Sequence, residues 1–333
     1  MRIAVLGGGS WGTALATVLS RAHKPHEISL WVRDPSLAKS IHGDRENKLY
    51  LPGHKISETV HVTHDASASL ENAGVVVVAI PAAHARVVYA RVMPQLLRGA
   101  AIVSATKGLE PSTHARMSEV IAQIALPGFS PRIAVLSGPS FAAEAAAGQP
   151  TAVVLASKDI ALADELQEEL AGPTFRLYTN EDVLGVELAG AMKNVIAIAV
   201  GACQGLGLGS NPLAALITRG LAEMTRLAVA LGARQETLSG LAGLGDLVLT
   251  CTGSLSRNRH VGIELGKGRA LSEILKDTRM VAEGVGTAGA LLALARESGI
   301  QLPITEQVEA ILHQARSPRE AIRSIMERPL KRE

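Results

Sequence analysis

The sequence predicts an α/β domain followed by an all-helical domain. Short aliphatic runs alternate with amphipathic stretches through the first half of the chain, a glycine-rich turn follows the first run, and no convincing strand pattern comes after Asn180. Near-continuous aliphatic strands are typical of a parallel sheet that is covered on both faces, and alternation of strands with helices indicates a doubly wound fold.

The strands are expected where the aliphatic runs lie. These runs are RIAVLG (2–7), ISLWV (28–32), VHVT (60–63), VVVVAI (75–80), AIVSAT (101–106), RIAVLSG (132–138), TAVVLAS (151–157) and FRLYTN (175–180). Helical patterns lie between most of them.

The length of 333 residues suits two ordinary domains of about 150 residues each. We expect a domain over residues 1–180 and a helical substrate domain over 181–333. Asn180 is a reasonable N-cap for the first helix of the second domain, because Glu181 and Asp182 follow it. The SPRE run at 317–320 predicts a capping box with proline at the first helical position.

Composition and charge exclude several classes of protein. Basic residues number 33 against 31 acidic ones, and no basic run interleaved with aromatic residues appears, so we expect no nucleic-acid partner. Cys203 and Cys251 form no CxxC pair and no metal-ligand spacing with histidine, which favours reduced thiols, a cytoplasmic protein and no metal site.

Membrane insertion is not expected either. The start of the chain, MRIAVLGGGSWG, leads directly into a strand pattern and lacks a signal-peptide core. The uncharged stretch from Asn194 to Thr218 contains polar residues, a proline and several glycines. A spanning helix needs about 20 mostly apolar residues, so this stretch is interpreted as two helices joined by a glycine-rich turn.

A dinucleotide-binding turn is expected between the first strand and the first helix. Gly7, Gly9 and Gly12 form the pattern GxGxxG in the required strand–turn–helix setting. The glycines allow a tight turn, approach of the backbone to a pyrophosphate, and close packing of helix on strand. The helix N-terminus would present N–H groups to the phosphates. The first domain is therefore predicted to be Rossmann-like.

The residues that recognise the cofactor ribose are expected at the end of the second strand, in LWVRDP. Arg33 can pair with a 2′-phosphate, whereas Asp34 can accept a hydrogen bond from a 2′-hydroxyl. Because Arg33 comes before Asp34, we expect NADPH as the cofactor, with NADH also used. A solvated Arg33 in a loop explains the spacing equally well. Trp11 either packs on the cofactor or fills space beneath the turn.

Two further segments lie after strands on the expected ligand-binding edge of the sheet. Lys107 follows the fifth strand run, and Gly138 and Ser140 follow the sixth and open a helix. Ligands bind at the carboxyl ends of parallel strands, and helix N-termini hold oxyanions. A single lysine is more often an exposed loop residue, but its position favours a functional role for Lys107.

Lys193 lies in the apolar helical stretch VELAGAMKNVIAIAVG. A buried, unpaired ammonium is costly, so such a lysine needs a partner or loses its proton. Its neighbours one turn away are Ala189, Gly190 and Ala197, which provide no acidic partner and leave room for a ligand.

A polar cluster follows in GLGDLVLTCTGSLSRNRH. Asp246 lies beside glycines before an apolar run, and Thr250, Ser256, Arg257 and Asn258 then lie within a short polar stretch. Ser256 as an N-cap would place Arg257 and Asn258 in a first turn, where a basic residue opposes the helix dipole unless an anion docks there. A plain basic loop beside solvent is the alternative.

With these residues assembled, the chain resembles bacterial-type glycerol-3-phosphate dehydrogenases along nearly its whole length. The matching segments are GGGSWGTALA, SATKGLE, SGPSFA, VELAGAMKNVIAIA, ALITRGLAEMTRL, GLGDLVLTCTG, LSRNR and LPIT. The resemblance implies reduction of dihydroxyacetone phosphate to sn-glycerol 3-phosphate with NADH or NADPH, supply of phospholipid synthesis, and a homodimer.

The resemblance also implies roles for individual residues. Lys193 is implied as proton donor and acceptor, and Lys107 as a substrate ligand that assists near the cofactor. The implied substrate positions are Lys107, Gly138, Ser140, Lys193, Asp246, Ser256, Arg257 and Asn258. The implied cofactor positions, besides the three glycines, are Ser10, Trp11, Arg33, Lys107, Ala142, Arg257, Val281 and Glu283.

Two departures from the family pattern bear on cofactor or effector behaviour rather than on the reaction. Gln204 stands where an acidic residue is common, and Ala282 stands where valine is usual. The expected mechanism joins cofactor and substrate in a cleft between the domains, where Lys193 protonates the developing alkoxide. Partial burial and Lys107 are expected to lower the pKa of Lys193. Asp246 either holds Lys193 or binds a substrate hydroxyl.

Two other functions remain open at this point. One is a dehydrogenase of β-hydroxy acids, which also uses a lysine on a helix, although the SRNR cluster favours a phosphorylated substrate. The other is a catalytically silent sensor of NAD(P), which would have little reason to keep both lysines, Asp246 and the phosphate cluster.

Overall fold

A computed structural model describes residues 1–126, 130–277 and 281–329. The chain forms two compact units, which are described separately below. The first comprises Met1–Glu110 and Ala115–Glu187, and the second comprises Pro111–His114 and the chain from Leu188 onward. The boundary between the units falls within one long helix.

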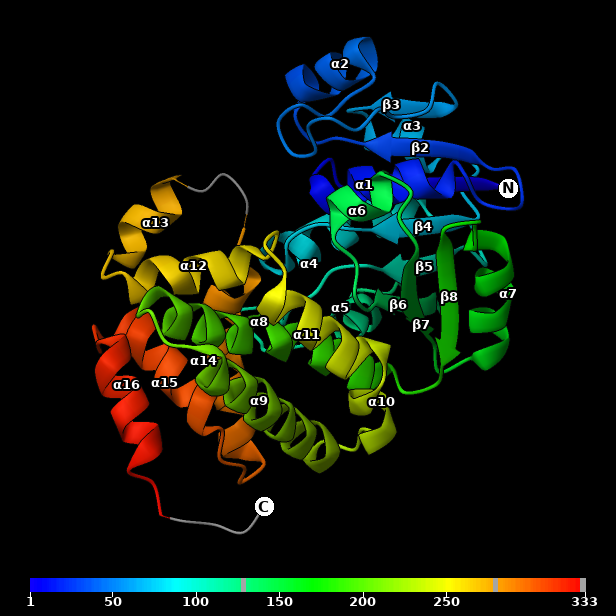
Figure 1. Ribbon diagram of the computed structural model, residues 1–333. Helices are drawn as coiled ribbons and strands as arrows, with labels where there is room; N and C mark the ends of the chain where they lie inside the picture. Colours follow the sequence, from blue (N-terminus) through cyan, green and yellow to red (C-terminus); the bar gives the residue numbers. More distant parts are fainter. Residues whose placement is uncertain (127–129, 278–280, 330–333) are drawn as a thin grey trace. The chain divides into compact units, whose positions relative to one another are not determined.

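The first unit is built on an eight-stranded sheet with the order β3-β2-β1-β4-β5-β6-β7-β8 (Figure 1). All eight expected strands are present. They are β1 (Arg2–Leu6), β2 (Glu27–Trp31), β3 (Val60–Thr63), β4 (Val75–Val78), β5 (Ala101–Ser104), β6 (Arg132–Ser137), β7 (Thr151–Ala156) and β8 (Phe175–Asn180).

The sheet is mostly parallel, as the aliphatic runs predicted, with one exception. Strand β7 pairs antiparallel to β6, with Val135 opposite Ala156, and β8 then runs parallel to β7. A strand buried on both faces shows the same aliphatic run in either direction. The strand direction therefore left no signal in the sequence.

Helices cover both faces of the sheet, each over its own apolar core. On one face lie α1 (Ser10–Leu19), α2 (Pro35–Asp44), α6 (Ala142–Ala146) and α7 (Ile160–Leu170). On the other face lie α3 (Ala66–Leu70), α4 (Ala82–Val92), a 3₁₀ turn (Met93–Gln95) and α5 (Met117–Gln123). The arrangement is that of a doubly wound domain.

Every element that the structure describes beyond β8 is helical. These elements are α8 (Val183–Gly205), α9 (Ser210–Ala230), α10 (Gln235–Ser239), a π-helical turn (Leu241–Gly245), α11 (Asp246–Thr252), α12 (Arg257–Gly266), α13 (Leu271–Asp277), α14 (Glu283–Glu297), α15 (Pro303–His313) and α16 (Pro318–Met326). The predicted capping box of α16 is present, with Ser317 and Glu320 bonded reciprocally.

The long uncharged stretch forms two helices, α8 and α9, joined by a glycine-containing turn, as predicted. By length and composition α8 is apolar enough to cross a membrane, but 89% of its most apolar window is buried inside the protein. The composition of α8 is accounted for by its place in the core.

The predicted N-cap of α8 was wrong. Asn180 ends strand β8, and its side chain accepts a hydrogen bond from the backbone of Asp182. The Asp182 carboxylate accepts from Gly185 N at 2.8 Å, so Asp182 caps the helix, which begins at Val183. Both side chains suit a cap by type, and the end of the sheet, which sequence patterns locate only approximately, decided between them.

Helices α8 and α12 pack backbone to backbone. A Cβ atom on Gly201 would lie 2.1 Å from the carbonyl oxygen of Arg259, and one on Gly262 would lie 2.1 Å from that of Ile198. Gly205 and Gly266 make equally close contacts further along the two helices. Only glycine fits at these positions, and the crossing fixes the start of α12 relative to α8.

Candidate active site

The glycine-rich turn has the geometry that a dinucleotide requires. Gly7 has a φ of +129°, which only glycine adopts readily, and a Cβ there would lie 2.4 Å from the carbonyl oxygen of Ala79. A Cβ on Gly12 would lie 1.9 Å from the carbonyl oxygen of Gly7. At Gly9, in contrast, a Cβ would meet nothing within 4 Å. The first and third glycines are needed by the protein itself, and the second leaves space for a ligand.

The N-terminus of α1 faces the same turn. Gly9 is its N-cap, no side chain caps this end, and its first turn contains no acidic residue. Trp11 packs against two apolar clusters, and its contact with a cofactor stays a prediction. Its buried Nε1 has no hydrogen-bond partner among the described residues. An uncapped helix N-terminus and a buried donor both suit a phosphate-bearing cofactor.

The two charged residues after β2, Arg33 and Asp34, have different surroundings. The Asp34 side chain caps α2 by accepting from Ser36 N at 2.8 Å and Leu37 N at 3.1 Å. The hydroxyl of Ser36 also donates to this carboxylate, and these bonds hold the pKa of Asp34 below its ordinary value. Arg33 is exposed at the carboxyl edge of the sheet. The geometry gives Asp34 a structural role and leaves the Arg33 guanidinium available to a ligand.

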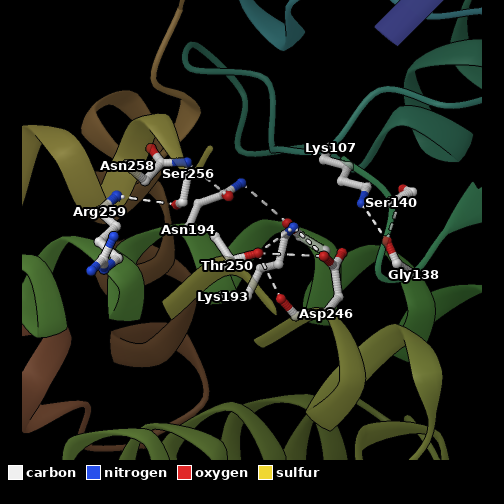
Figure 2. Close-up of polar contacts among 11 residues, drawn as sticks. Lys107, Gly138, Ser140, Lys193, Asn194, Asp246, Thr250, Ser256, Asn258 and Arg259 are labelled. Atoms are coloured by element: carbon white, nitrogen blue, oxygen red, sulfur yellow. Dashed lines mark hydrogen bonds and ion pairs between the residues drawn. The ribbon is translucent and has the colours of Figure 1, made fainter. Parts of the chain in front are cut away.

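Lys107 and the segment after β6 meet in the first unit. Lys107 Nζ donates to the carbonyl oxygen of Gly138 at 2.9 Å, and Ser140 Oγ donates to the same oxygen at 3.0 Å (Figure 2). Lys107 is therefore half-buried and held, rather than loose in solvent. The helix that follows Ser140 begins at Ala142 and is only one turn long, with Phe141 at its N-cap.

Lys193 contacts two residues of α11. Its Nζ donates to Asp246 Oδ1 at 2.5 Å and to Thr250 Oγ1 at 2.9 Å (Figure 2). Thr250 Oγ1 in turn donates to the backbone oxygen of Asp246 at 2.6 Å. Asp246 thus contacts Lys193 directly, and its binding of a substrate hydroxyl stays a prediction.

Lys193 and Asp246 are both buried. Lys193 is 6% exposed and Asp246 is 1% exposed. Burial raises the pKa of the neighbouring Cys251 thiol to about 12, although Lys193 opposes that shift. Burial disfavours the Lys193 ammonium while the Asp246 carboxylate stabilises it, so the expected fall of its pKa stays a prediction.

Helix α12 begins as predicted. Ser256 is its N-cap and accepts from Arg259 N at 3.2 Å, which places Arg257 and Asn258 in the first turn. The first turn contains no acidic residue. Arg257 has an exposed surface there, yet the protein around its guanidinium lowers the pKa of that group by desolvation, and the charge of Glu283 opposes the shift.

Asn258 bridges three helices. Its amide nitrogen donates to Asn194 Oδ1 on α8 at 2.9 Å, and its Oδ1 accepts from Gly284 N on α14 at 3.0 Å. Asn194 in turn donates to the carbonyl oxygen of Gly190 at 3.2 Å. The buried Asn258 therefore ties the start of α12 to the turn of α8 that carries Lys193 (Figure 2).

The other predicted cofactor residues lie at separate places in the two units. Ser10 is the first residue of α1 and Ala142 the first of α6, both in the first unit. In the second unit, Val281 is 47% exposed and Glu283 is the first residue of α14. Their part in cofactor binding stays a prediction.

Sequence reasoning left two residues of the site without a role. Thr250 lies one turn after Asp246 on α11, a spacing that puts both side chains on one helix face. Asn194 follows Lys193 directly, and an amide in an apolar helix signals a hydrogen-bonded partner. Both signals are present in the sequence, but neither identifies the partner residue.

Comparison with known families places both units. The model for the NAD-dependent glycerol-3-phosphate dehydrogenase N-terminus matches residues 2–163. The model for the C-terminus of the same family matches residues 182–323. Together they account for most of the chain.

Individual proteins similar to this chain come from the same family. The chain is 54% identical to a glycerol-3-phosphate dehydrogenase [NAD(P)+] of Koribacter versatilis, over 98% of this chain and 97% of the relative. It is 51% identical to the one of Nitratidesulfovibrio vulgaris strain Hildenborough, with 100% of both covered. The crystal structure of the Coxiella burnetii enzyme is similar with a TM-score of 0.93 and 42% identity, covering 98% of this chain and 99% of that one. This protein belongs to the NAD-dependent glycerol-3-phosphate dehydrogenase family.

Proposed function

We propose that this protein reduces dihydroxyacetone phosphate reversibly to sn-glycerol 3-phosphate with NADPH or NADH, and so supplies glycerophospholipid synthesis. The buried contact between Lys193 and Asp246 supports the proposal most directly, because it holds the Lys193 ammonium against a fixed partner. Family membership and the glycine-rich turn support the cofactor.

The cofactor is proposed to bind along the carboxyl edge of the sheet in the first unit. Its pyrophosphate would lie against Gly9 and the N-terminus of α1, where a Cβ would meet open space. Ser10, Trp11, Arg33, Lys107, Ala142, Arg257, Val281 and Glu283 complete the proposed set. The bound nicotinamide supplies the hydride. Exposed Arg33 favours NADPH over NADH, because it can pair with a 2′-phosphate.

Lys193 is proposed as the general acid and base. In the reduction its ammonium donates a proton from Nζ to the carbonyl oxygen of the substrate as negative charge develops there. In the reverse direction the neutral amine takes the proton from the hydroxyl. Asp246 and Thr250 orient Nζ, since their oxygens accept two of its N–H hydrogen bonds. Asp246 also stabilises the charged form before transfer.

The substrate phosphate is proposed to dock at the start of α12. Arg257 offers a guanidinium there, and the backbone of Asn258 belongs to the first turn, where N–H groups point outward from the helix end. Ser256 holds this turn in shape through its cap. Lys107, Gly138 and Ser140 are proposed as further substrate contacts, because Lys107 and Ser140 share one carbonyl oxygen as acceptor.

Further features of the protein are also proposed. The division into residues 1–180 and 181–333 is proposed as the functional one, with cofactor and substrate parts. A cytoplasmic location accords with two buried free cysteines. A homodimer is proposed on the resemblance to the bacterial enzymes.

The experiment is a spectrophotometric assay of the purified protein. Loss of NADPH or NADH absorbance with dihydroxyacetone phosphate, and little loss with unphosphorylated β-keto acids, is the expected result. Oxidation with β-keto acids alone would instead favour the β-hydroxy acid dehydrogenase. Binding of the cofactor without oxidation by any of these substrates would favour a sensor.

A further inference from the structure

The loop that starts at Lys107 is closed on itself. Leu109 and Arg116 form an isolated antiparallel bridge, and Glu110 N donates to the carbonyl oxygen of Ala115 at 2.9 Å. The two ends of the loop therefore lie side by side. An interaction that holds these paired ends also restrains the backbone beside Lys107.

One end of the loop is held by a buried carboxylate. Glu110 is 5% exposed, and both its oxygens accept from Arg86 of α4, each at 2.7 Å. A bidentate pair of this kind fixes direction as well as distance. This pair of hydrogen bonds fastens the loop to α4 of the first unit.

The other end of the loop is held by Glu187 of α8. Its Oε2 accepts from Arg116 Nη1 at 2.8 Å and from Ser118 Oγ at 2.6 Å, and its Oε1 accepts from Ser118 N at 2.8 Å. Glu187 is 7% exposed. All these donors belong to the return of the Lys107 loop and the first residues of α5.

Helix α8 also carries Lys193, roughly 9 Å further along its axis at 1.5 Å per residue. The carboxylate that receives the Lys107 loop therefore belongs to the same continuous helix as the proposed general acid. Such a helix can carry a restraint along its axis, because its backbone hydrogen bonds allow little change in rise.

We propose that Glu187 is a positioning residue, whose bonds to Arg116 and Ser118 hold the Lys107 loop on the helix that carries Lys193. The proposal deepens the proposed function, on which its kinetic part rests. Loss of the Glu187 bonds should leave the glycine turn intact and loosen the loop. Turnover then falls, because a displacement of about 1 Å at a reacting group can cost about 100-fold in rate.

A purely structural role for Glu187 makes a different prediction. Any buried carboxylate with hydrogen-bonded partners contributes to stability, so its loss would lower the melting temperature without a specific effect on turnover. Glu223 of α9 is a matched control for that case. It is 2% exposed and accepts from Ile304 N, Thr305 N and Thr305 Oγ1, none of which belongs to the Lys107 loop.

The kinetic test compares Glu187→Gln with Glu223→Gln in the full-length protein. We expect Glu187→Gln to lower kcat about tenfold, within the range that misplacement produces, and to leave the KM for NADPH within about twofold. Glu223→Gln should change kcat less than about twofold. Unchanged kcat in Glu187→Gln, or an equal fall in both variants, would overturn the proposal.

Partner variants sharpen the test. Arg116→Lys keeps a cation for Glu187 and should retain most of kcat. Arg116→Met removes the Arg116 bond but leaves both Ser118 bonds to Glu187, so kcat should fall less than in Glu187→Gln. The double variant should be no slower than Glu187→Gln alone, because both act on the same restraint. If Glu187→Gln does not fold, Ser118→Ala removes the hydroxyl that donates to Glu187 and accepts from Arg116. This variant should still lower kcat without raising the KM for NADPH. Full kcat in Ser118→Ala would then count against the proposal.

Amide hydrogen exchange separates this inference from the proposed reaction. Glu187→Gln should speed exchange in residues 107–118, and Glu223→Gln should not. A wild-type protein that fails to oxidise NADPH with dihydroxyacetone phosphate would refute the reaction, whereas equal exchange in that loop for all three proteins would refute the positioning role.

Discussion

Lys193 Nζ lies 2.5 Å from Asp246 Oδ1, although the two residues are 53 positions apart in the chain. The lysine comes from the middle of α8 and the aspartate from the first residue of α11, directly after the π-helical turn Leu241–Gly245. Each charge makes burial of the other tolerable. The pair therefore supports the helical unit, and in the proposed reaction Lys193 holds the proton that is transferred.

Lys193→Ala tests the chemical half of that relationship. The variant removes the proposed proton donor, and turnover should fall by about 100- to 10,000-fold, the usual contribution of general acid catalysis. Affinity for NADPH should stay near that of wild type, since the glycine turn is untouched. Steady-state rates and cofactor titration by fluorescence measure both quantities. Turnover close to wild type would remove Lys193 from the reaction.

Asp246→Asn tests the structural half. The change leaves the Lys193 ammonium buried without its counter-charge, which should lower stability by about 3 kcal/mol or more. Addition of Lys193→Met to this variant removes the unpaired charge and should restore much of the stability without restoring turnover. Denaturant unfolding of both variants measures the effect. Equal stability of the single and the double variant would contradict this account.

Arg257→Ala tests the phosphate site at the start of α12. Loss of one hydrogen-bonded charge costs about 1.5–3 kcal/mol, so the KM for dihydroxyacetone phosphate should rise about 10- to 100-fold. Arg269→Ala is the control, because Arg269 follows the end of α12 and pairs with Glu264 of α12 and Asp277 of α13. The control should leave the KM unchanged. An unchanged KM in Arg257→Ala would place the phosphate elsewhere.

Features encoded by short stretches could be predicted from the sequence. The eight strands follow from aliphatic runs, and the glycine turn follows from three residues within one strand–turn–helix segment. The caps by Ser256 and Ser317 likewise depend on neighbours in the chain. In each case the partners are close in sequence, so the pattern itself contains the geometry.

Features that depend on tertiary packing could not be predicted in the same way. Asn194 and Asn258 meet across 64 positions, and no local pattern links them. The antiparallel direction of β7 and the choice of Asp182 over Asn180 as the cap depend on where the sheet ends. The sequence identified Asp246 as important but left its partner open, because only the fold brings α11 onto α8.

Gly262→Ala tests the close crossing of α8 and α12. The added Cβ would lie 2.1 Å from the carbonyl oxygen of Ile198, so the helices must separate, at a cost of about 1–3 kcal/mol or more. The matched control is Gly286→Ala in α14, where a Cβ would meet nothing within 4 Å. The control should gain up to about 1 kcal/mol from helix propensity. Thermal unfolding with the same sign for both variants would refute the crossing as a tight contact.

The buried carboxylate of Glu223 is expected to make the free energy of unfolding depend on pH. Its carboxylate accepts from the N-terminus of α15, yet burial dominates and raises its pKa to about 7 from the ordinary value of 4.5. A raised folded-state pKa means that the folded protein holds this proton more tightly than the unfolded chain. The contribution to stability is therefore fully present below about pH 4.5 and is lost as the pH rises through about 7.

The Glu223→Gln variant isolates this contribution, because glutamine does not titrate. Between pH 5 and pH 8 the wild type should lose stability relative to Glu223→Gln, with a limiting difference on the order of 3 kcal/mol for a shift of this size. Denaturant midpoints at each pH measure it, and only the difference between the two proteins counts, since other groups titrate in both. Parallel curves would show that the Glu223 carboxylate stays ionised throughout, and that its bonds to Ile304 and Thr305 outweigh its burial.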